Sequence, residues 1–153
     1  MILNRGNMWS VFGQYDVFVF TANSYIRNDG ALVMGRGIAK VVRDRFRGLD
    51  LRIGKWIDRQ VGHLGAYGFV TAVIRDMNVT HRIGVFQVKR NFADSAELGL
   101  IKASVTSLDS WIRIHRPKRI DMNFPGIGNG KLKRADVLTL IETLPDCVHI
   151  WER

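Results

Sequence analysis

Hydrophobic and polar residues follow two patterns along the chain. Short runs rich in β-branched and aromatic residues predict strands, and they occupy residues 16–21, 68–75, 82–88, 119–124 and 147–151. Apolar residues three and four positions apart predict helices, and these cover residues 37–46, 49–62, 94–115 and 135–144. Because strands alternate with helices, we expect an α/β sandwich with a mixed sheet, formed by residues 1–153 as a single domain.

The ends of the longest predicted helix carry their own signals. The helix begins at Asp94 or Ser95 and continues to His115. Ser95 is the expected N-cap, because a serine side chain accepts a hydrogen bond from the free N–H groups of the first turn. Pro117 lies just beyond the predicted end, where a helix cannot easily continue. Residues 76–78, between two predicted strands, indicate a hairpin connection.

Two glycine-bearing loops are the strongest functional signal. The first runs from Val33 to Lys40 and leads into a predicted helix, and the second runs from Asn123 to Gly130 after a short predicted strand. Glycine lets the backbone approach a ligand closely, and a helix that begins after such a turn directs free N–H groups and a positive dipole end at an anion. Ligands of α/β sheets bind at the carboxyl ends of strands. We therefore expect the two loops to lie side by side and to hold two linked phosphates.

The charge of the chain supports an anionic ligand. The formal net charge is +9, from 23 Lys and Arg against 14 Asp and Glu. Basic residues cluster at 43–47, 89–90, 113–119 and 131–134, and two of these clusters flank the glycine loops. Such a balance favours a nucleotide, a nucleic acid or a group attached to nucleic acid. Solubility and nonspecific affinity for polyanions are the simpler explanation.

Composition also argues against several classes of protein. No run of eighteen apolar residues is present, so no membrane span is expected, and residues 1–5 do not resemble a signal peptide. A single cysteine, Cys147, excludes an intramolecular disulfide and a cysteine-rich zinc site. The four histidines lack metal-ligand spacing. We expect neither a metal nor a cofactor, and a cytoplasmic location.

Four motifs, in order along the chain, resemble those of one family. They read Gly6-Asn7-Met8-Trp9, Thr21-Ala22-Asn23, Met34-Gly35-Arg36-Gly37-Ile38-Ala39 and Pro125-Gly126-Ile127-Gly128-Asn129-Gly130. Together they resemble the macro domain, an ADP-ribose-binding α/β module, over nearly the whole chain. Within this family, the motifs are most similar to those of macro proteins of bacteriophages and of the branch that includes DNA ADP-ribosyl glycohydrolase antitoxins. The resemblance implies a three-layer α/β/α sandwich around a central mixed sheet.

The resemblance also implies a set of ligand-binding residues. The adenine would lie near Asn7 and Met8, where family members often have Asp in place of Asn7 and where Asn can still accept a hydrogen bond. Asn23 would bind the distal ribose, although an ordinary turn residue is the alternative. Phe124 would line the pocket, with a core role about equally favoured. The two loops would enclose the diphosphate through Gly35, Arg36, Gly37, Ile38 and Ala39 and through Pro125, Gly126, Ile127, Gly128, Asn129 and Gly130.

The resemblance assigns catalysis to Lys89 together with Asn23. In the antitoxin-like branch a lysine in the matching segment is catalytic. Lys89 would either attack C1″ of the ribose to form a Schiff base or stabilise charge on the departing group. Attack requires a lowered pKa, which Arg36 and Arg90 could supply. The plain alternative is a solvated Lys89-Arg90 pair at a strand end.

A catalytic carboxylate is harder to identify. Some lysine-dependent relatives carry an Asp just after the second glycine loop, whereas here residues 131–134 read Lys-Leu-Lys-Arg and the first acid is Asp136. This departure puts a Lys/Asp mechanism in doubt. Asp29 and Asp94 are alternatives, although Asp29 is equally a turn residue and Asp94 equally a helix N-terminal acid.

Three functions follow from the resemblance. The first is a hydrolase that removes ADP-ribose from a target, which the basic surface could dock if the target is nucleic acid. The second is a phosphatase of ADP-ribose 1″-phosphate, and the third is a noncatalytic binder of ADP-ribose-type nucleotides. A monomer in the cytoplasm, or in the host cytoplasm if the chain is phage-encoded, is the expected form. Outside the family, the alternative is a nucleic-acid-binding protein whose loops grip backbone phosphates.

Overall fold

Strand β2 (Val17–Ala22) shows how the sequence builds a layered structure. Val17 and Val19 belong to one hydrophobic cluster, and Phe18 and Phe20 belong to a second cluster on the other side of the strand. Successive side chains of a strand point to opposite faces, so a strand that is apolar on both faces must be covered on both. β2 therefore lies in the middle of the molecule.

The computed structural model describes residues 1–153 and contains a six-stranded mixed sheet in the order β1-β6-β5-β2-β4-β3. The other strands are β1 (Ile2–Arg5), β3 (Phe69–Asp76), β4 (Val79–Gln87), β5 (Ile120–Asn123) and β6 (Val148–Glu152). All neighbours pair in parallel except β3, which pairs antiparallel with β4. Two parallel neighbours of β2 therefore end at the same edge of the sheet as β2 itself.

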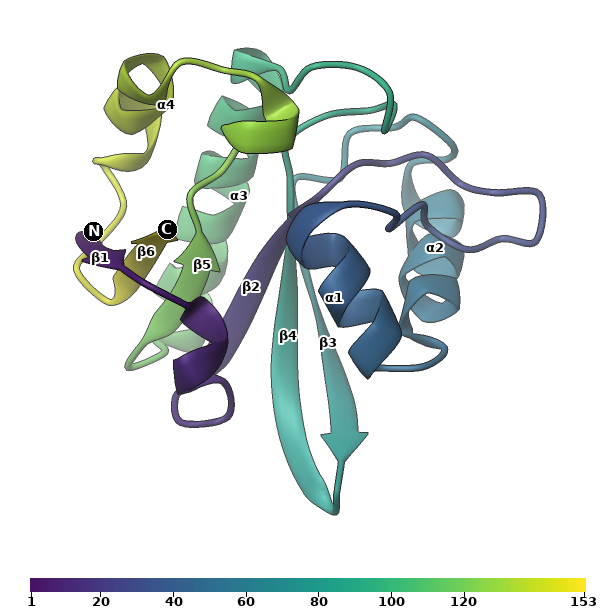
Figure 1. Cartoon of the computed structure of the whole chain (residues 1–153), viewed down its shortest axis with the longest axis horizontal. Coiled ribbons are helices and arrows are strands. Elements are labelled where there is room, and N and C mark those ends of the chain that lie inside the picture. Colours follow the sequence, from purple (N-terminus) through teal and green to yellow (C-terminus); the bar gives the residue numbers. More distant parts are fainter.

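Helices cover both faces of the sheet (Figure 1). Helices α1 (Gly37–Arg45) and α2 (Leu49–Gln60) pack through the cluster that contains Phe18 and Phe20. Helices α3 (Leu98–His115) and α4 (Arg134–Ile141) pack through the cluster that contains Val17 and Val19. The predicted three-layer α/β/α sandwich with a central mixed sheet is confirmed.

Three details differ from the expectations. β1 and the short 3₁₀ helix η1 (Met8–Val11) carried no recognised pattern, because β1 has four residues and pairs with β6 at the opposite end of the chain. α3 begins at Leu98, with Glu97 as the N-cap residue, so the prediction of a start at Asp94 or Ser95 with Ser95 as the cap is wrong. The backbone N–H groups of Ala96 and Glu97 instead donate to Gly130 and Val88, which holds this segment outside the helix.

The hairpin between β3 and β4 is confirmed, and it extends well beyond the rest of the sheet (Figure 1). Met77 and Asn78 form its turn, both with positive φ. None of the four α-helices combines the length and the apolar character that a membrane span requires.

A close contact of α2 holds the segment that leads to the first glycine loop. A Cβ at Gly54 would lie 2.1 Å from the carbonyl oxygen of Gly30 and 2.6 Å from the backbone nitrogen of Leu32. The Leu32 N–H donates to the carbonyl oxygen of Asp50 in the first turn of the same helix. Only glycine at position 54 lets this segment pass so close to the helix.

Gly54→Ala is therefore expected to lower the free energy of unfolding by about 2 kcal/mol, because the added methyl group overpacks a backbone contact. Gly99→Ala, also in a helix but with nothing near its Cβ position, should raise the free energy of unfolding by about 0.5 kcal/mol. Urea unfolding of both variants and of the unaltered protein measures the difference. Equal effects of the two substitutions would contradict the close contact.

Candidate functional site

A cavity of about 830 Å³ opens at the edge of the sheet where β2, β5 and β6 end. Thr21, Ala22 and Asn23 line it from the end of β2, Asn123 from the end of β5, and Trp151 and Glu152 from the end of β6. Both glycine loops border the same cavity. This is the position at which open α/β sheets bind their ligands.

The first glycine loop forms one wall and passes into α1. Gly37 is the first residue of the helix and has φ +57°, a value that glycine adopts without strain. Arg36 precedes it in an extended conformation, and no side chain caps this helix N-terminus. The free N–H groups and the positive end of the helix dipole are therefore directed at the cavity, where they favour an anion.

The second glycine loop forms the facing wall through the short 3₁₀ helix η2 (Gly128–Gly130). A Cβ at Gly37 would lie 3.1 Å from Nδ2 of Asn129, so the two loops approach each other directly. Gly130 accepts a hydrogen bond from the Ala96 N–H, and Gly126 accepts one from the Leu132 N–H. The expected side-by-side arrangement of the two loops is what the structure contains.

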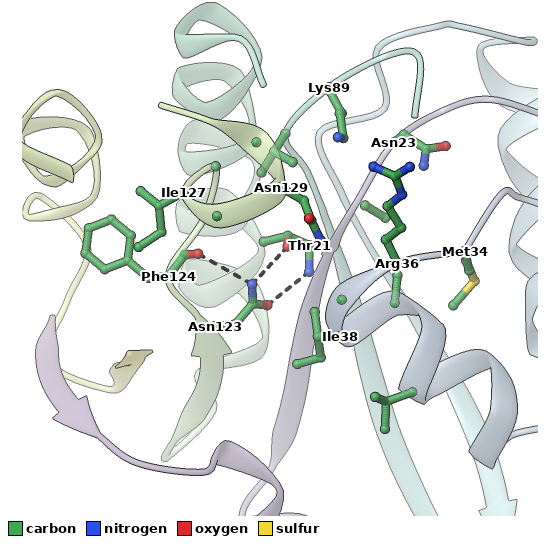
Figure 2. A pocket seen from close by; sticks show the side chains of 18 of the residues that line it. Thr21, Asn23, Met34, Arg36, Ile38, Lys89, Asn123, Phe124, Ile127 and Asn129 are labelled. Atoms are coloured by element: carbon green, nitrogen blue, oxygen red, sulfur yellow. Dashed lines mark hydrogen bonds between the residues drawn. The ribbon is translucent and has the colours of Figure 1, made fainter. Parts of the chain in front are cut away.

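Asn123 joins the strands from which the walls of the cavity arise (Figure 2). Its Oδ1 accepts a hydrogen bond from the Thr21 N–H at 3.1 Å, and its Nδ2 donates to Oγ1 of Thr21 at 2.9 Å. Nδ2 also lies 3.5 Å from the carbonyl oxygen of Phe124. One side chain thus fixes the spacing of the ends of β2 and β5.

The end of the cavity expected to hold a base contains Asn7 and Met8. Oδ1 of Asn7 accepts a hydrogen bond from the Trp9 N–H at 3.0 Å and caps η1, so this oxygen is already engaged once. Met8 is buried, and Trp9 packs on Phe18 with the Arg45 guanidinium over its ring. Asn7 therefore has a structural role in addition to the one assigned by resemblance.

Phe124, Trp151 and Glu152 complete the same part of the lining. Phe124 is buried, with the Arg134 guanidinium 5.3 Å from its ring centroid. Arg134 also forms a two-pronged ion pair with Glu152, with donor–acceptor distances of 2.8 and 2.7 Å. The hydrogen bond from Arg134 lowers the pKa of Glu152, so this carboxylate stays ionised at neutral pH.

Asn23, Arg36 and Lys89 gather at the other end of the cavity (Figure 2). Asn23 is 6% exposed, and its Nδ2 donates to the carbonyl oxygen of Val33 while its Oδ1 accepts from the Tyr25 N–H, each at 2.9 Å. One N–H of the amide remains without a protein partner, because Nδ2 carries two hydrogens. This second hydrogen of Nδ2 is available to donate a hydrogen bond to a ligand.

The Lys89 side chain turns into the cavity and contacts the loop that follows it. Its Nζ donates to the carbonyl oxygens of Phe92 and Asp94, at 3.3 and 3.1 Å. Burial lowers the pKa of Lys89, and the nearby charges of Arg36 and Lys131 lower it further, while Asp94 opposes the shift. A lysine with a lowered pKa in a cavity is a candidate for a functional amine.

The cavity brings together all the residues expected to bind ligand except Pro125, which is buried in the turn of the second loop. Of the candidate acids, Asp94 lines the cavity, whereas Asp29 is exposed and pairs with Arg27, and Asp136 lies in the first turn of α4. Asp94 is therefore the candidate acid beside Lys89.

No group of three or more potential metal-ligating side chains is present.

Several lining residues had no role assigned from the sequence. They include Phe92, Trp151, Glu152 and Arg153. Thr21 belongs to the Thr21-Ala22-Asn23 motif and Asn123 begins the second glycine loop, yet neither side chain had a role of its own assigned. Asn123 had a signal that could have been used, because it is a polar residue at the end of a buried strand, as is Asn23. Trp151 and Glu152 had none, since their place beside the second loop depends on the pairing of β6 with β5.

Comparisons with known proteins agree on the fold. No protein-family model matches the chain, and no curated protein matches its sequence. The structure is similar to the macrodomain of Mycobacterium tuberculosis DarG, with a TM-score of 0.73 and 22% identity over 99% of this chain and 98% of that one. It is similar to the macrodomain of Thermus aquaticus DarG, with a TM-score of 0.70 and 23% identity over 98% and 95%. A third similar structure, Thermosipho africanus DarTG in complex with ADP-ribose, has a TM-score of 0.70 and 16% identity over 99% of this chain and 41% of that one. The chain has the macrodomain fold.

Proposed function

We propose that the chain binds ADP-ribose or an ADP-ribosyl group and hydrolyses the bond at C1″ of its distal ribose. One observation carries the proposal: a single cavity contains two facing glycine loops and, at one end, a partly buried lysine with a lowered pKa. The loops suit a diphosphate, and the lysine suits chemistry on a group attached beyond it. The cavity volume of about 830 Å³ lies in the usual range for small-molecule sites.

Charge and similarity support the same ligand. Arg36, Lys89 and Lys131 line the cavity, in a chain whose net charge is +9, so an anion is attracted to it. The similar DarTG structure was solved in complex with ADP-ribose. Its fold is shared over nearly the whole of this chain, and the two glycine loops provide the features that a diphosphate needs.

Lys89 has the chemistry of a nucleophile in this proposal. Its neutral amine forms a bond to C1″ as the bond from C1″ to the departing group breaks. One of the two protons of the amine then passes to the departing group, which leaves in its protonated form. The ribose ring then opens at the C1″–O4″ bond to give a Schiff base, with the proton of the amine passing to O4″. Water adds to the Schiff base and releases ADP-ribose and the free amine. The lowered pKa increases the fraction of neutral amine at a given pH.

Asp94 is the carboxyl group we assign to proton transfer with the departing group. It lines the cavity in the loop whose carbonyl oxygens hold Lys89. Glu152 is the other acidic residue that lines the cavity. Arg134 keeps it ionised by lowering its pKa, and it lies beside Phe124 and Trp151. The Arg134–Glu152 pair lies on the far side of the cavity from Lys89, which leaves Asp94 as the lining carboxyl group beside the amine.

Gly35→Glu is expected to weaken ADP-ribose binding at least tenfold, because a like charge close to a diphosphate costs more than about 1.4 kcal/mol. Position 35 accepts a side chain without strain, since its φ is not positive and nothing lies near its Cβ position. Gly99→Glu adds the same charge to an equally open position in α3 and serves as the matched control. Calorimetric titration with ADP-ribose measures the affinity. No binding by the unaltered protein would refute the proposed ligand, and nucleic acid would become the ligand to test.

Lys89→Gln is expected to lower kcat at least about 100-fold while ADP-ribose still binds, because the loops that hold the diphosphate remain. ADP-ribosylated DNA, ADP-ribosylated protein and ADP-ribose 1″-phosphate are the substrates to assay. Borohydride added during turnover should leave the ribose attached to Lys89 in the unaltered protein and not in the variant. The matched control is Lys102→Gln, an exposed lysine on α3. Full activity of Lys89→Gln, or no turnover of any substrate by the unaltered protein, would contradict hydrolysis through Lys89.

Arg36→Gln is expected to move the rise of kcat with pH to a higher pH. Removal of a neighbouring positive charge raises the pKa of Lys89 toward its ordinary value. The neutral amine, which is the active form, then appears at a higher pH. A series of kcat measurements across pH detects the shift. Arg43→Gln, which removes an arginine paired with Asp44 on α1, should leave the profile in place. A profile that does not move in Arg36→Gln would show that Lys89 is not the titrating group.

A further inference from the structure

A fully buried amide, that of Gln87, lies in the protein interior next to the backbone of Lys89. Gln87 is the last residue of β4, pairs with Ala22 at the end of β2, and is 0% exposed. An interior strand position of this kind is normally apolar, because an uncompensated buried amide is costly. Gln87 does not line the cavity, and its amide faces the interior of the protein. Its presence needs an explanation in the packing around it.

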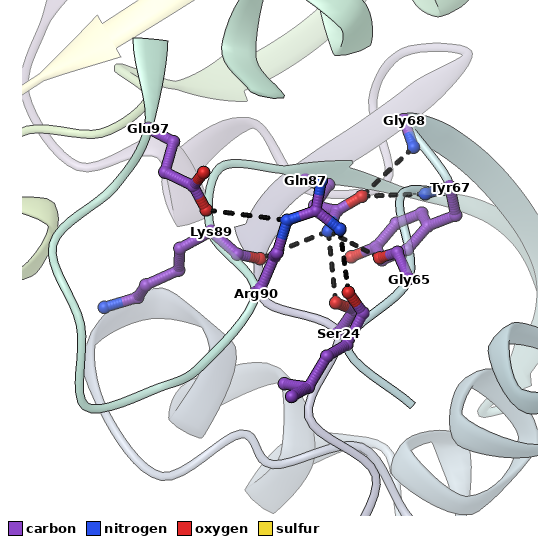
Figure 3. Close-up of polar contacts among 9 residues, drawn as sticks. Ser24, Gly65, Tyr67, Gly68, Gln87, Lys89, Arg90 and Glu97 are labelled. Atoms are coloured by element: carbon purple, nitrogen blue, oxygen red, sulfur yellow. Dashed lines mark hydrogen bonds and ion pairs between the residues drawn. The ribbon is translucent and has the colours of Figure 1, made fainter. Parts of the chain in front are cut away.

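Both ends of the Gln87 amide are satisfied (Figure 3). Oε1 accepts hydrogen bonds from the Tyr67 N–H at 2.8 Å and the Gly68 N–H at 3.3 Å. Nε2 donates toward Oγ of Ser24 at 3.2 Å and the carbonyl oxygen of Gly65 at 3.0 Å. It also lies 3.3 Å from the carbonyl oxygen of Lys89. The accepting end and the donating end of this amide thus hold different parts of the chain.

The partners of Gln87 come from segments far apart in the sequence. Ser24 follows β2, and residues 65–68 connect α2 with β3. The Gln87 carbonyl oxygen accepts a hydrogen bond of 2.7 Å from Oγ of Ser104, a buried serine of α3. Gln87 is therefore bonded to the segment after β2, to the connection between α2 and β3, to helix α3 and to Lys89.

A second link of this network reaches Asn23. The Tyr67 hydroxyl donates to the carbonyl oxygen of Asn23 at 2.8 Å. Burial raises the pKa of Tyr67, so the hydroxyl remains protonated and remains a donor. Ser24, next to Asn23, also donates through its N–H to the carbonyl oxygen of Arg90, next to Lys89, at 3.1 Å. The two residues assigned to catalysis thus share one set of buried hydrogen bonds.

We propose that Gln87 is a positioning residue that sets where Lys89 and Asn23 lie at the end of the cavity. It acts on Lys89 through the Lys89 carbonyl oxygen and on Asn23 through Tyr67 and Ser24. The inference rests on the proposed function of Lys89. Gln87 makes no hydrogen bond to either glycine loop, and its one link to them is indirect, through the bond from Asn23 to the Val33 carbonyl oxygen at the start of the first loop. Gln87 therefore acts mainly on the Lys89 end of the cavity.

The consequence is a separation of turnover from binding. A displacement of about 1 Å at a reacting group costs on the order of 100-fold in rate. Gln87→Met keeps the length of the side chain and removes both arms of the amide. We expect this variant to lose 10- to 100-fold in kcat, in line with that displacement, while its Kd for ADP-ribose stays within about threefold, because the loops are unchanged.

The pKa of Lys89 provides a readout that a purely structural role of Gln87 would not move. Proteins labelled with ¹³C at the lysine ε-carbon report each lysine's titration by NMR, and the loss of one signal in Lys89→Gln assigns Lys89. Gln87→Met should raise the pKa of Lys89 toward its ordinary value, since a displaced side chain is less buried and lies farther from Arg36 and Lys131. Gln60→Met, at the exposed end of α2, is the matched control and should leave kcat, Kd and this pKa unchanged.

The outcomes separate this inference from the proposed function. A folded Gln87→Met variant with unaltered kcat and an unaltered Lys89 pKa would overturn the role of Gln87. If the unaltered protein does not bind or process ADP-ribose, the proposed function fails, and the Lys89 pKa in Gln87→Met still decides whether Gln87 positions Lys89. If Gln87→Met does not fold, Gln87→Glu decides: it keeps the acceptor for the Tyr67 and Gly68 N–H groups and removes the N–H bonds to Ser24, Gly65 and the Lys89 carbonyl oxygen. It should lower kcat about threefold or more, whereas an unchanged kcat would overturn the proposal.

Discussion

The hydrogen bonds between Asn123 and Thr21 are the contact on which the candidate site depends. They join the carboxyl ends of β5 and β2, the two parallel strands from which the site is built. The second glycine loop follows β5 directly, and the Asn23 segment follows β2. Parallel pairing brings strand ends to a common edge, but it does not set the distance between the side chains beyond them. One amide does so here, and it lines the cavity that results.

Buried polar side chains are concentrated around this edge of the sheet. Asn23, Ser24, Gln87 and Ser104 form a connected group behind the Lys89 end of the cavity, and no buried side-chain nitrogen or oxygen lacks a hydrogen-bond partner. A satisfied polar network in a low-dielectric interior restricts the geometry of its members more than apolar packing does. The opposite end relies on larger groups, namely Phe124, Trp151 and the Arg134–Glu152 pair. The two ends of one cavity are thus held by different kinds of interaction.

The sequence predicted the architecture because its main signals are local. Short runs rich in β-branched and aromatic residues identified β2 through β6, and the glycine loops identified both walls of the cavity. Interactions between distant residues were the part it missed. β1 is too short to show a period and exists through its pairing with β6. Ser95 has the character of a cap, yet the chain at Ala96 and Glu97 is held by Gly130 and Val88, so α3 begins later. Gln87 showed no sign of its connections, since Ser24 and Tyr67 lie far from it in sequence.

The second glycine loop is already held in place by the fold. Ala96 and Leu132 bond to its carbonyl oxygens, and a Cβ at Gly126 would lie 2.7 Å from the Cδ1 of Ile101, so the loop rests against α3. Ordering a backbone residue costs about 1–2 kcal/mol of conformational entropy. That entropy is lost when the chain folds and not when a ligand arrives. Contacts that a ligand makes with this wall therefore contribute to affinity almost undiminished, at the expense of the marginal stability of the folded chain.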